Sequence, residues 1–263
     1  MEEDLPHPDP DSQYSGTNAH LEMLKDMLMT YNMYDAKRVG YVQGMSDLLS
    51  IVYAIMQDDS DAFWCFCGFM DRMVYPLKIG LTKKYNFLLD QTGMRRQLVT
   101  LKHLTQLMIP KLYAHLEKSG SDEFFFLFRQ LLVWFKREFS WDDVCTLWEV
   151  LWTDYLSGQF HLFVALGILD KHKEVIMGIS SDEKFNEEHL REFDEVLKYI
   201  NDLSMTIDLE STLVRAEVLF YRFQGTVELI DKKNAELARE GKAAEGTISD
   251  ELRGLLKKEY PKE

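Results

Sequence analysis

Apolar residues recur along most of this 263-residue chain at the spacing that places them on one face of a helix. Strand-type alternation is nearly absent, so the pattern predicts an all-α fold built as one multi-helix domain. Glycines, prolines and capping residues divide the pattern into segments. We expect helices at residues 19–34, from Gly44 onward, at 63–73, at 98–116 with a break at Pro110, at 124–139, from Ser140 onward, and at 160–177, 191–203 and 209–233.

The helix that opens near Gly44 has the most informative polar positions. Its apolar residues fall on one face: Met45, Leu48, Leu49, Val52, Ile55 and Met56. Gln43, Ser46, Asp47 and Ser50 project from the other side. A neutral glutamine amide at a helix start can orient a water molecule or bind a polar partner without a pKa shift. It can also bond its own backbone, and spacing alone favours this structural role without excluding the other.

The sequence around this glutamine resembles a known family motif. Residues 41–49 read Tyr-Val-Gln-Gly-Met-Ser-Asp-Leu-Leu, which looks like the glutamine-finger motif of the TBC domain, the GTPase-activating module for Rab-type small GTPases. Further similar blocks follow in the family's order at residues 61–66, 128–132, 135–139 and 147–153. The similarity runs from about Thr17 to Phe223 and is nearest to a fungal-type branch of the family. The resemblance implies an all-α TBC-type domain.

The resemblance also implies a mechanism and a set of site residues. Gln43 matches the catalytic glutamine that orients the hydrolytic water in a Rab active site. We expect Tyr41 and Gly44 to shape the turn and Asp47 to support the glutamine from the same helix face. These three residues form the expected partner-binding set together with Arg129, for which anchoring of the core is the alternative role.

TBC domains also supply an arginine, carried by an Ile-x-x-Asp-x-x-Arg-Thr block upstream of the stretch that matches residues 4–17. That block does not occur in this sequence, so we interpret the domain as truncated at its N-terminus, either in a truncated isoform or through a gene model with a wrong start. Arg38 is the only arginine before Gln43, and we interpret it as a surface residue. Because an arginine inserted in trans is worth roughly 10³–10⁵ in rate, we expect these 263 residues to stimulate Rab hydrolysis far less than a chain that carries the block.

Composition removes several other classes of protein. The net charge of −14 argues against nucleic acid and against unassisted binding to an anionic membrane. No apolar run reaches the ~18 residues that a membrane span needs. The three cysteines lie in apolar stretches and read as small core residues of a reducing compartment. We expect no cofactor of the chain's own, since GTP and Mg²⁺ would belong to the GTP-bound Rab partner.

We divide the chain into three parts. Residues 1–16 read as an extended segment, 17–228 as the TBC-type domain, and 229–263 as a charged helical or disordered tail. Within the domain, 74–85 and 178–189 look like loop insertions that proteases should cut before any helix. Loop insertions cost little, because closure entropy grows slowly with loop length.

Two alternatives from other classes remain to be weighed. A non-catalytic helical module would bind a GTPase or an adaptor without accelerating hydrolysis. An all-helical metal-dependent enzyme would use the acidic run 58–61, but its required second motif fails because Met205 stands at the hydroxyl position. We therefore interpret the acidic run as a helix cap. From the family resemblance we expect a cytoplasmic protein that is recruited peripherally to endosomal or vacuolar membranes.

Overall fold

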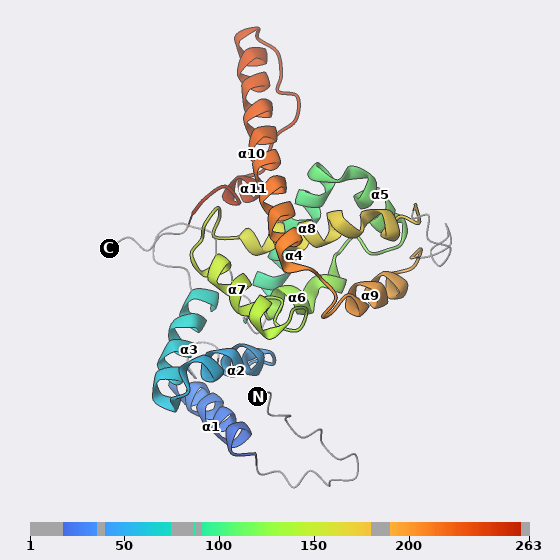
Figure 1. Ribbon diagram of the computed structural model, residues 1–263. Helices are drawn as coiled ribbons and strands as arrows, with labels where there is room; N and C mark the ends of the chain where they lie inside the picture. The colour runs from blue at the N-terminus through green and yellow to red at the C-terminus, as the bar shows by residue number, and fades with distance from the viewer. Residues whose placement is uncertain (1–17, 36–39, 75–86, 88–90, 180–189, 259–263) are drawn as a thin grey trace. The chain divides into compact units, whose positions relative to one another are not determined.

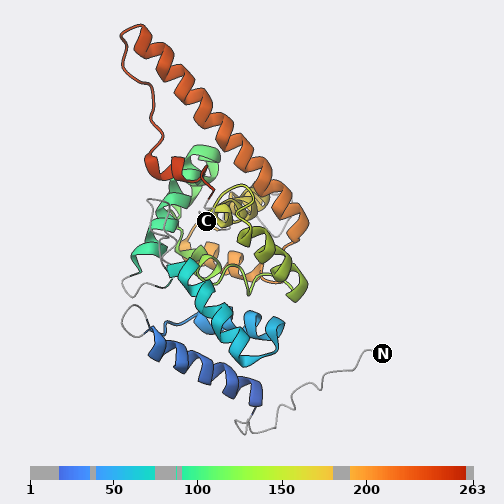
Figure 2. The same ribbon diagram turned by 90° about the vertical axis from the view of Figure 1, so that its left-hand side faces the viewer.

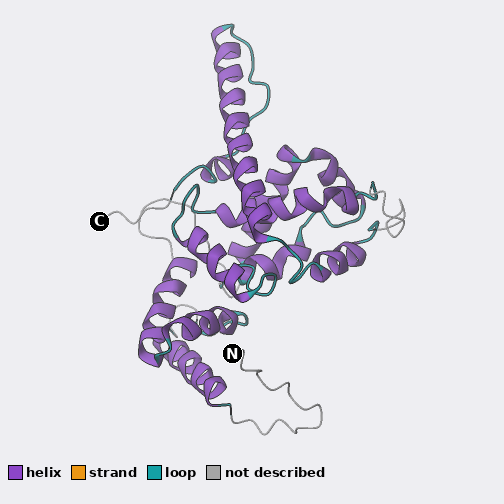
Figure 3. Ribbon diagram, viewed as in Figure 1, coloured by secondary structure: helices purple, strands orange, loops and turns teal. Residues whose placement is uncertain are grey.

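The computed structural model describes residues 18–35, 40–74, 87, 91–179 and 190–258 (Figure 1). All regular elements in these ranges are helices, and no strand occurs among them (Figure 3). The predicted all-α class is therefore confirmed. The chain divides into two compact units, residues 1–67 and 68–263, and the boundary falls inside one helix.

The first unit holds α1 (Ala19–Tyr34), α2 (Met45–Met56) and the start of α3 (Asp59–Val74). Asn18 caps α1, because its side-chain oxygen accepts a hydrogen bond from the backbone N–H of His20 at 3.0 Å. Helix α1 buries Tyr31, whose ring meets the edge of Phe66 from α3 with centroids 5.1 Å apart. The start of α3 is capped by Asp58, which accepts the N–H of Asp61 at 2.9 Å. The acidic run is thus a helix cap, as the sequence predicted.

The second unit is built on α8 (Phe160–Ile176), whose residues from Phe160 to Asp170 are all buried. The long helix α10 (Leu209–Arg239) packs along it. Gly167 allows the close approach, since a Cβ there would stand 3.2 Å from the carbonyl oxygen of Thr212. The remaining elements are α4 (Thr92–Met108), α5 (Pro110–Lys118), η1 (Phe125–Leu127), α6 (Phe128–Leu132), α7 (Trp141–Trp152), α9 (Phe193–Asp202) and α11 (Asp250–Gly254).

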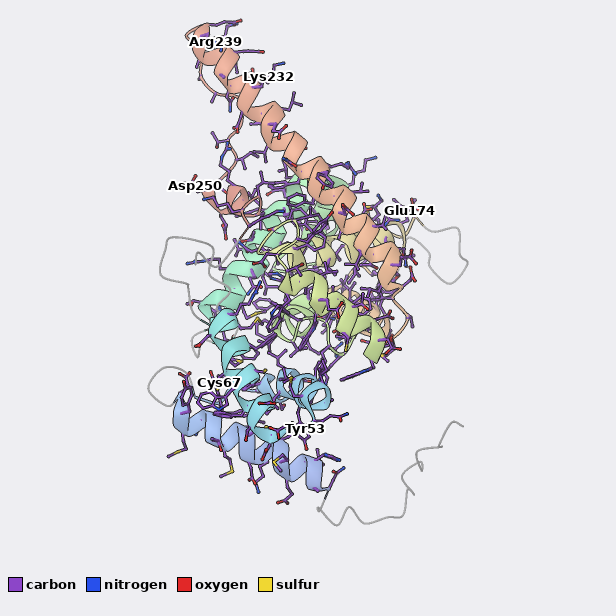
Figure 4. The ribbon with its side chains drawn as sticks, turned by 60° about the vertical axis from the view of Figure 1, so that its left-hand side comes forward. Tyr53, Cys67, Glu174, Lys232, Arg239 and Asp250 are labelled. Carbon is purple, nitrogen blue, oxygen red and sulfur yellow. The ribbon has the colours of Figure 1, made fainter. Side chains whose placement is uncertain are left out.

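The last part of α10 extends past α8 and returns through a loop to α11 (Figure 2). Lys232 and Arg239 lie on this extension, and Asp250 opens α11 (Figure 4). Side chains hold the return in place: Asn234 donates to the carbonyl of Gly246 at 2.8 Å. Thr100 of α4 donates to the Glu251 carboxylate at 2.5 Å. Part of the charged segment predicted as a tail is therefore folded onto α4.

One predicted helix is wrong. The sequence pattern predicts a continuous helix over 124–139, whereas the structure has only η1 and the five-residue α6 there. Phe124, Trp134 and Phe135 adopt left-handed backbone angles, with φ of 58°, 49° and 59°, and all three rings are fully buried. Trp148 of α7 donates its indole N–H to the Trp134 carbonyl at 2.9 Å. Packing of large rings has overridden local helix preference.

Candidate functional site

Gln43 lies in a tight turn that leads directly into α2. The N–H of Met45 donates to the carbonyl of Val42 at 3.2 Å and closes the turn around Gln43 and Gly44. Gly44 has φ 101° and ψ −18°, close to the third position of a type II turn, which requires positive φ. Glycine adopts this conformation without steric cost, so the sequence Gln-Gly fits the turn.

The turn presents the Gln43 side chain to solvent. Gln43 is exposed, and its amide makes no hydrogen bond within the part of the chain that the structure describes. Met45, two residues later, is completely buried and fixes the start of α2 in the first unit. The amide is thus an available donor and acceptor on an anchored turn, which agrees with the predicted exposure of Gln43.

Tyr41 precedes Gln43 on the same segment, and 45% of its surface is exposed. Its backbone N–H donates to the Asn32 side-chain oxygen on α1 at 2.9 Å. Gly40 comes directly before it with φ 68°, and its N–H donates to the carbonyl of Asp35 at 3.3 Å. Sequence reasoning missed Asn32, because an exposed asparagine on a helix surface has no distinguishing pattern.

Asp47 differs from the sequence expectation. The helical wheel predicted it on the exposed face with Gln43, but only 8% of its surface is accessible. The first residues of α2 are more buried than its last ones, whichever helix face they lie on. Residues from Met45 to Leu49 are buried, except for half-buried Ser46, whereas Ile55 near the other end is 58% exposed. Asp47 lies in the first turn, where a carboxylate interacts favourably with the helix dipole. Its position fits support of the helix start rather than direct contact with a partner.

Arg129 lies in the second unit and makes an ion pair. Its Nη2 donates to the Glu138 carboxylate at 2.9 Å and to the Ser204 hydroxyl at 3.2 Å. The Glu138 side chain is 1% exposed, whereas that of Arg129 is 40% exposed. Burial raises the pKa of Glu138, and the Arg129 guanidinium opposes that rise. This geometry fits the anchoring role for Arg129, with its outer part still open to solvent.

The histidines of α8 have structural partners. His161 is buried and its Nε2 lies 2.6 Å from the Gln97 side-chain oxygen. His172 Nδ1 lies 2.8 Å from the Tyr199 hydroxyl. Burial, together with the nearby charges of Lys171 and Arg215, lowers the pKa of His172 to about 4. No cluster of histidine, cysteine and carboxylate side chains suited to a metal ion occurs within the described ranges.

Several sequence predictions fall on residues whose structure is not described. Arg38, nearly all of the 74–85 segment and most of 178–189 lie outside the described residues. The cysteines can be placed: Cys67 is buried as expected, but Cys65 is exposed rather than part of the core. Among the described residues, no helix combines the length and the apolar character needed to cross a bilayer.

Comparison with known proteins gives consistent matches. The family model of the Rab-GTPase-TBC domain matches residues 1–177. The GTPase-activating protein GYP7 of Yarrowia lipolytica is 56% identical over 246 residues, which cover 93% of this chain and 31% of that protein. TBC1 domain family member 17 of Homo sapiens is 42% identical over 214 residues, 81% of this chain and 30% of that protein. The chain thus spans about a third of the length of these curated relatives.

Two solved structures resemble the fold. The Ypt/Rab-GAP domain of Gyp1p matches with a TM-score of 0.61 at 19% identity, covering 78% of this chain and 66% of that one. The Chlamydomonas flagellar RabGAP TBC domain matches with a TM-score of 0.57 at 18% identity, covering 80% and 63%. At such identities the likeness concerns the fold alone.

Proposed function

Because this chain belongs to the Rab-GTPase-TBC domain family, we propose that it is a GTPase-activating module that inserts the Gln43 amide into the active site of a GTP-bound Rab protein. The observation that carries the proposal is the exposed amide on a glycine-closed turn, without a partner among the described residues. The Yarrowia lipolytica relative, which is named as a GTPase-activating protein and is 56% identical, supports the same activity.

In this proposal the reaction is hydrolysis of GTP at the Rab, and the chain adds no reaction of its own. Water attacks the γ-phosphorus, the bond to the bridging oxygen breaks, and GDP and phosphate leave. The Gln43 carbonyl accepts a hydrogen bond from the attacking water, and its NH₂ group donates to a phosphoryl oxygen. Tyr41, exposed beside it, contacts the GTPase, while Gly44 holds the turn and Asp47 supports the helix start.

The transition state also needs cationic stabilisation. The proposal assigns Gln43 the water-orienting part of catalysis. The exposure of Gln43 and Tyr41 also fits a second candidate, a module that binds GTP-loaded Rab without accelerating hydrolysis. Both candidates predict binding to GTP-loaded Rab, but only the first predicts faster hydrolysis of GTP.

The test measures binding and hydrolysis separately on a panel of Rab proteins. Single-turnover phosphate release follows hydrolysis of GTP, and equilibrium titration with a non-hydrolysable GTP analogue follows binding. Gln43→Ala should lower the stimulated rate by roughly 10²-fold, the usual cost of losing one preorganised catalytic group. Its binding should stay near that of the unaltered chain.

Gln106→Ala is the matched control, because Gln106 is an exposed glutamine on α4 in the second unit. Equal stimulated rates for the unaltered chain and Gln43→Ala would refute the catalytic role of Gln43. Binding by the unaltered chain without any acceleration would select the non-catalytic module instead. A chain that neither binds nor stimulates any Rab would remove both candidates.

For localisation, we propose a cytoplasmic protein recruited peripherally to endosomal or vacuolar membranes. The support is the family resemblance together with the acidic charge of −14, which disfavours unassisted binding to anionic lipid. A fluorescent fusion imaged with endosomal and vacuolar markers tests the location, and uniform cytosolic signal under all conditions would contradict recruitment.

A further inference from the structure

The segment that carries Gln43 is tied to α1 by one side chain. The Asn32 Oδ1 atom accepts the backbone N–H of Tyr41 at 2.9 Å, two residues before the glutamine. Asn32 itself sits in the last turn of α1, a helix whose Tyr31 is packed against Phe66. The contact therefore links the glutamine segment to an element that is itself anchored in the first unit.

Gly40 makes room for this contact. Its φ of 68° lies in the left-handed region, and a Cβ at this position would stand 2.7 Å from the Asn32 side-chain oxygen. Such a distance is far inside van der Waals contact, so any side chain here would displace either Asn32 or the backbone. The backbone of residue 40 can approach the Asn32 oxygen only because residue 40 is glycine.

The other end of the segment is fixed independently. The N–H of Met45 bonds the Val42 carbonyl at 3.2 Å, and Met45 is completely buried. Gln43 thus lies between two fixed points, the Asn32 contact at Tyr41 and the buried start of α2. Without the Asn32 contact, the Tyr41 N–H would lose its partner, and the segment before Gln43 would be held by the 3.3 Å hydrogen bond from the Gly40 N–H to the Asp35 carbonyl. The position of Gln43 would then be less firmly fixed.

We propose that Asn32 is a positioning residue for the Gln43 amide, acting through the backbone of Tyr41 rather than by touching the GTPase or the nucleotide. The inference rests on the proposed function of Gln43. Its expected consequence is kinetic: a displaced glutamine still permits binding but orients the water poorly. A displacement of about 1 Å can cost on the order of 10²-fold in rate.

The experiment compares Asn32→Ala with Asn32→Asp, which keeps an oxygen in place to accept the Tyr41 N–H. Single-turnover hydrolysis by GTP-loaded Rab should slow by roughly 10- to 10²-fold with Asn32→Ala and recover most of its rate with Asn32→Asp. Titration with the non-hydrolysable analogue should show unchanged binding for both. Thr30→Ala is the matched control, because Thr30 is an exposed neutral residue of α1 whose hydroxyl donates to the Asp26 carbonyl on the same helix.

A double variant separates positioning from a general structural role. If Asn32 acts through Gln43, then Asn32→Ala combined with Gln43→Ala should be no slower than Gln43→Ala alone. The proposal would be overturned if the double variant were slower than Gln43→Ala by the full factor that Asn32→Ala costs alone. Loss of binding with Asn32→Ala would also overturn it. Loss of rate with Gln43→Ala but none with Asn32→Ala would overturn the positioning role only. No loss with Gln43→Ala would overturn both this role and the proposed function.

Discussion

Replacing Arg129 with methionine tests whether this arginine anchors the core. The variant keeps an apolar stem of similar length and removes the guanidinium that meets Glu138 at 2.9 Å. Glu138 is 1% exposed, so its carboxylate would lose its ion-pair partner while remaining buried, and the backbone hydrogen bond and charge of Arg137 would remain. Breaking a buried pair by removing one partner typically costs about 3–5 kcal/mol. Because Arg129 is 40% exposed and screened by water, we expect a smaller loss of about 2–3 kcal/mol.

The loss of stability should also depend on pH, and the ionisation of Glu138 determines whether it grows or shrinks as the pH rises. Burial raises the pKa of Glu138 and Arg129 opposes the rise, so removing Arg129 raises it further. A carboxyl whose folded pKa is raised favours the fold at low pH and loses that contribution as pH rises through the folded pKa. The stability deficit of Arg129→Met should therefore be smallest at acidic pH and grow as the pH rises through the raised pKa of Glu138.

Urea denaturation followed by circular dichroism measures this deficit at several pH values. Glu138→Gln is the matched control, because it removes the buried charge while keeping the side-chain size. Combining it with Arg129→Met should restore part of the lost stability. A deficit below about 1 kcal/mol, or one that does not change with pH, would refute the anchoring role and return Arg129 to the partner-binding set.

Four further outcomes follow from the same structure. Gln43→Ala should change the free energy of unfolding by no more than about 0.5 kcal/mol in urea denaturation, because its amide has no partner within the described residues. Gly44→Ala should cost about 1–2 kcal/mol in the same measurement, since its φ of 101° strains any side chain. Gly167→Ala should cost about 1–3 kcal/mol by crowding the Thr212 carbonyl on α10. His172 should remain neutral in an NMR titration until the pH approaches its pKa of about 4.

Local signals made much of the fold predictable from the sequence. The first helix was predicted and observed over 19–34, because its apolar residues repeat with helical spacing, and the structure shows that Asn18 caps it. Ser140 likewise begins α7 by accepting the N–H of Asp143. Each of these signals lies within a few residues of the boundary that it sets.

The failures concern contacts between residues distant in sequence. Nothing in the residues around Trp134 indicates that its carbonyl will accept a bond from Trp148, which helps to hold a left-handed turn there. The burial of Asp47 depends in the same way on what covers the first turns of α2, which a helical wheel cannot contain. The Asn32 contact with Tyr41 spans nine residues and depends on a backbone path that the wheel does not describe.

These contacts separate stability from activity at the glutamine. The turn is held by backbone bonds, by Gly44 and by buried Met45, none of which uses the Gln43 side chain. The amide can therefore be altered without loss of the fold, and altering the turn moves the amide without changing its chemistry. Because an amide does not titrate in the physiological range, the contribution of Gln43 to hydrolysis should be independent of pH. A pH dependence that disappears in Gln43→Ala would contradict this reasoning, since it would require a titrating group that acts through the glutamine.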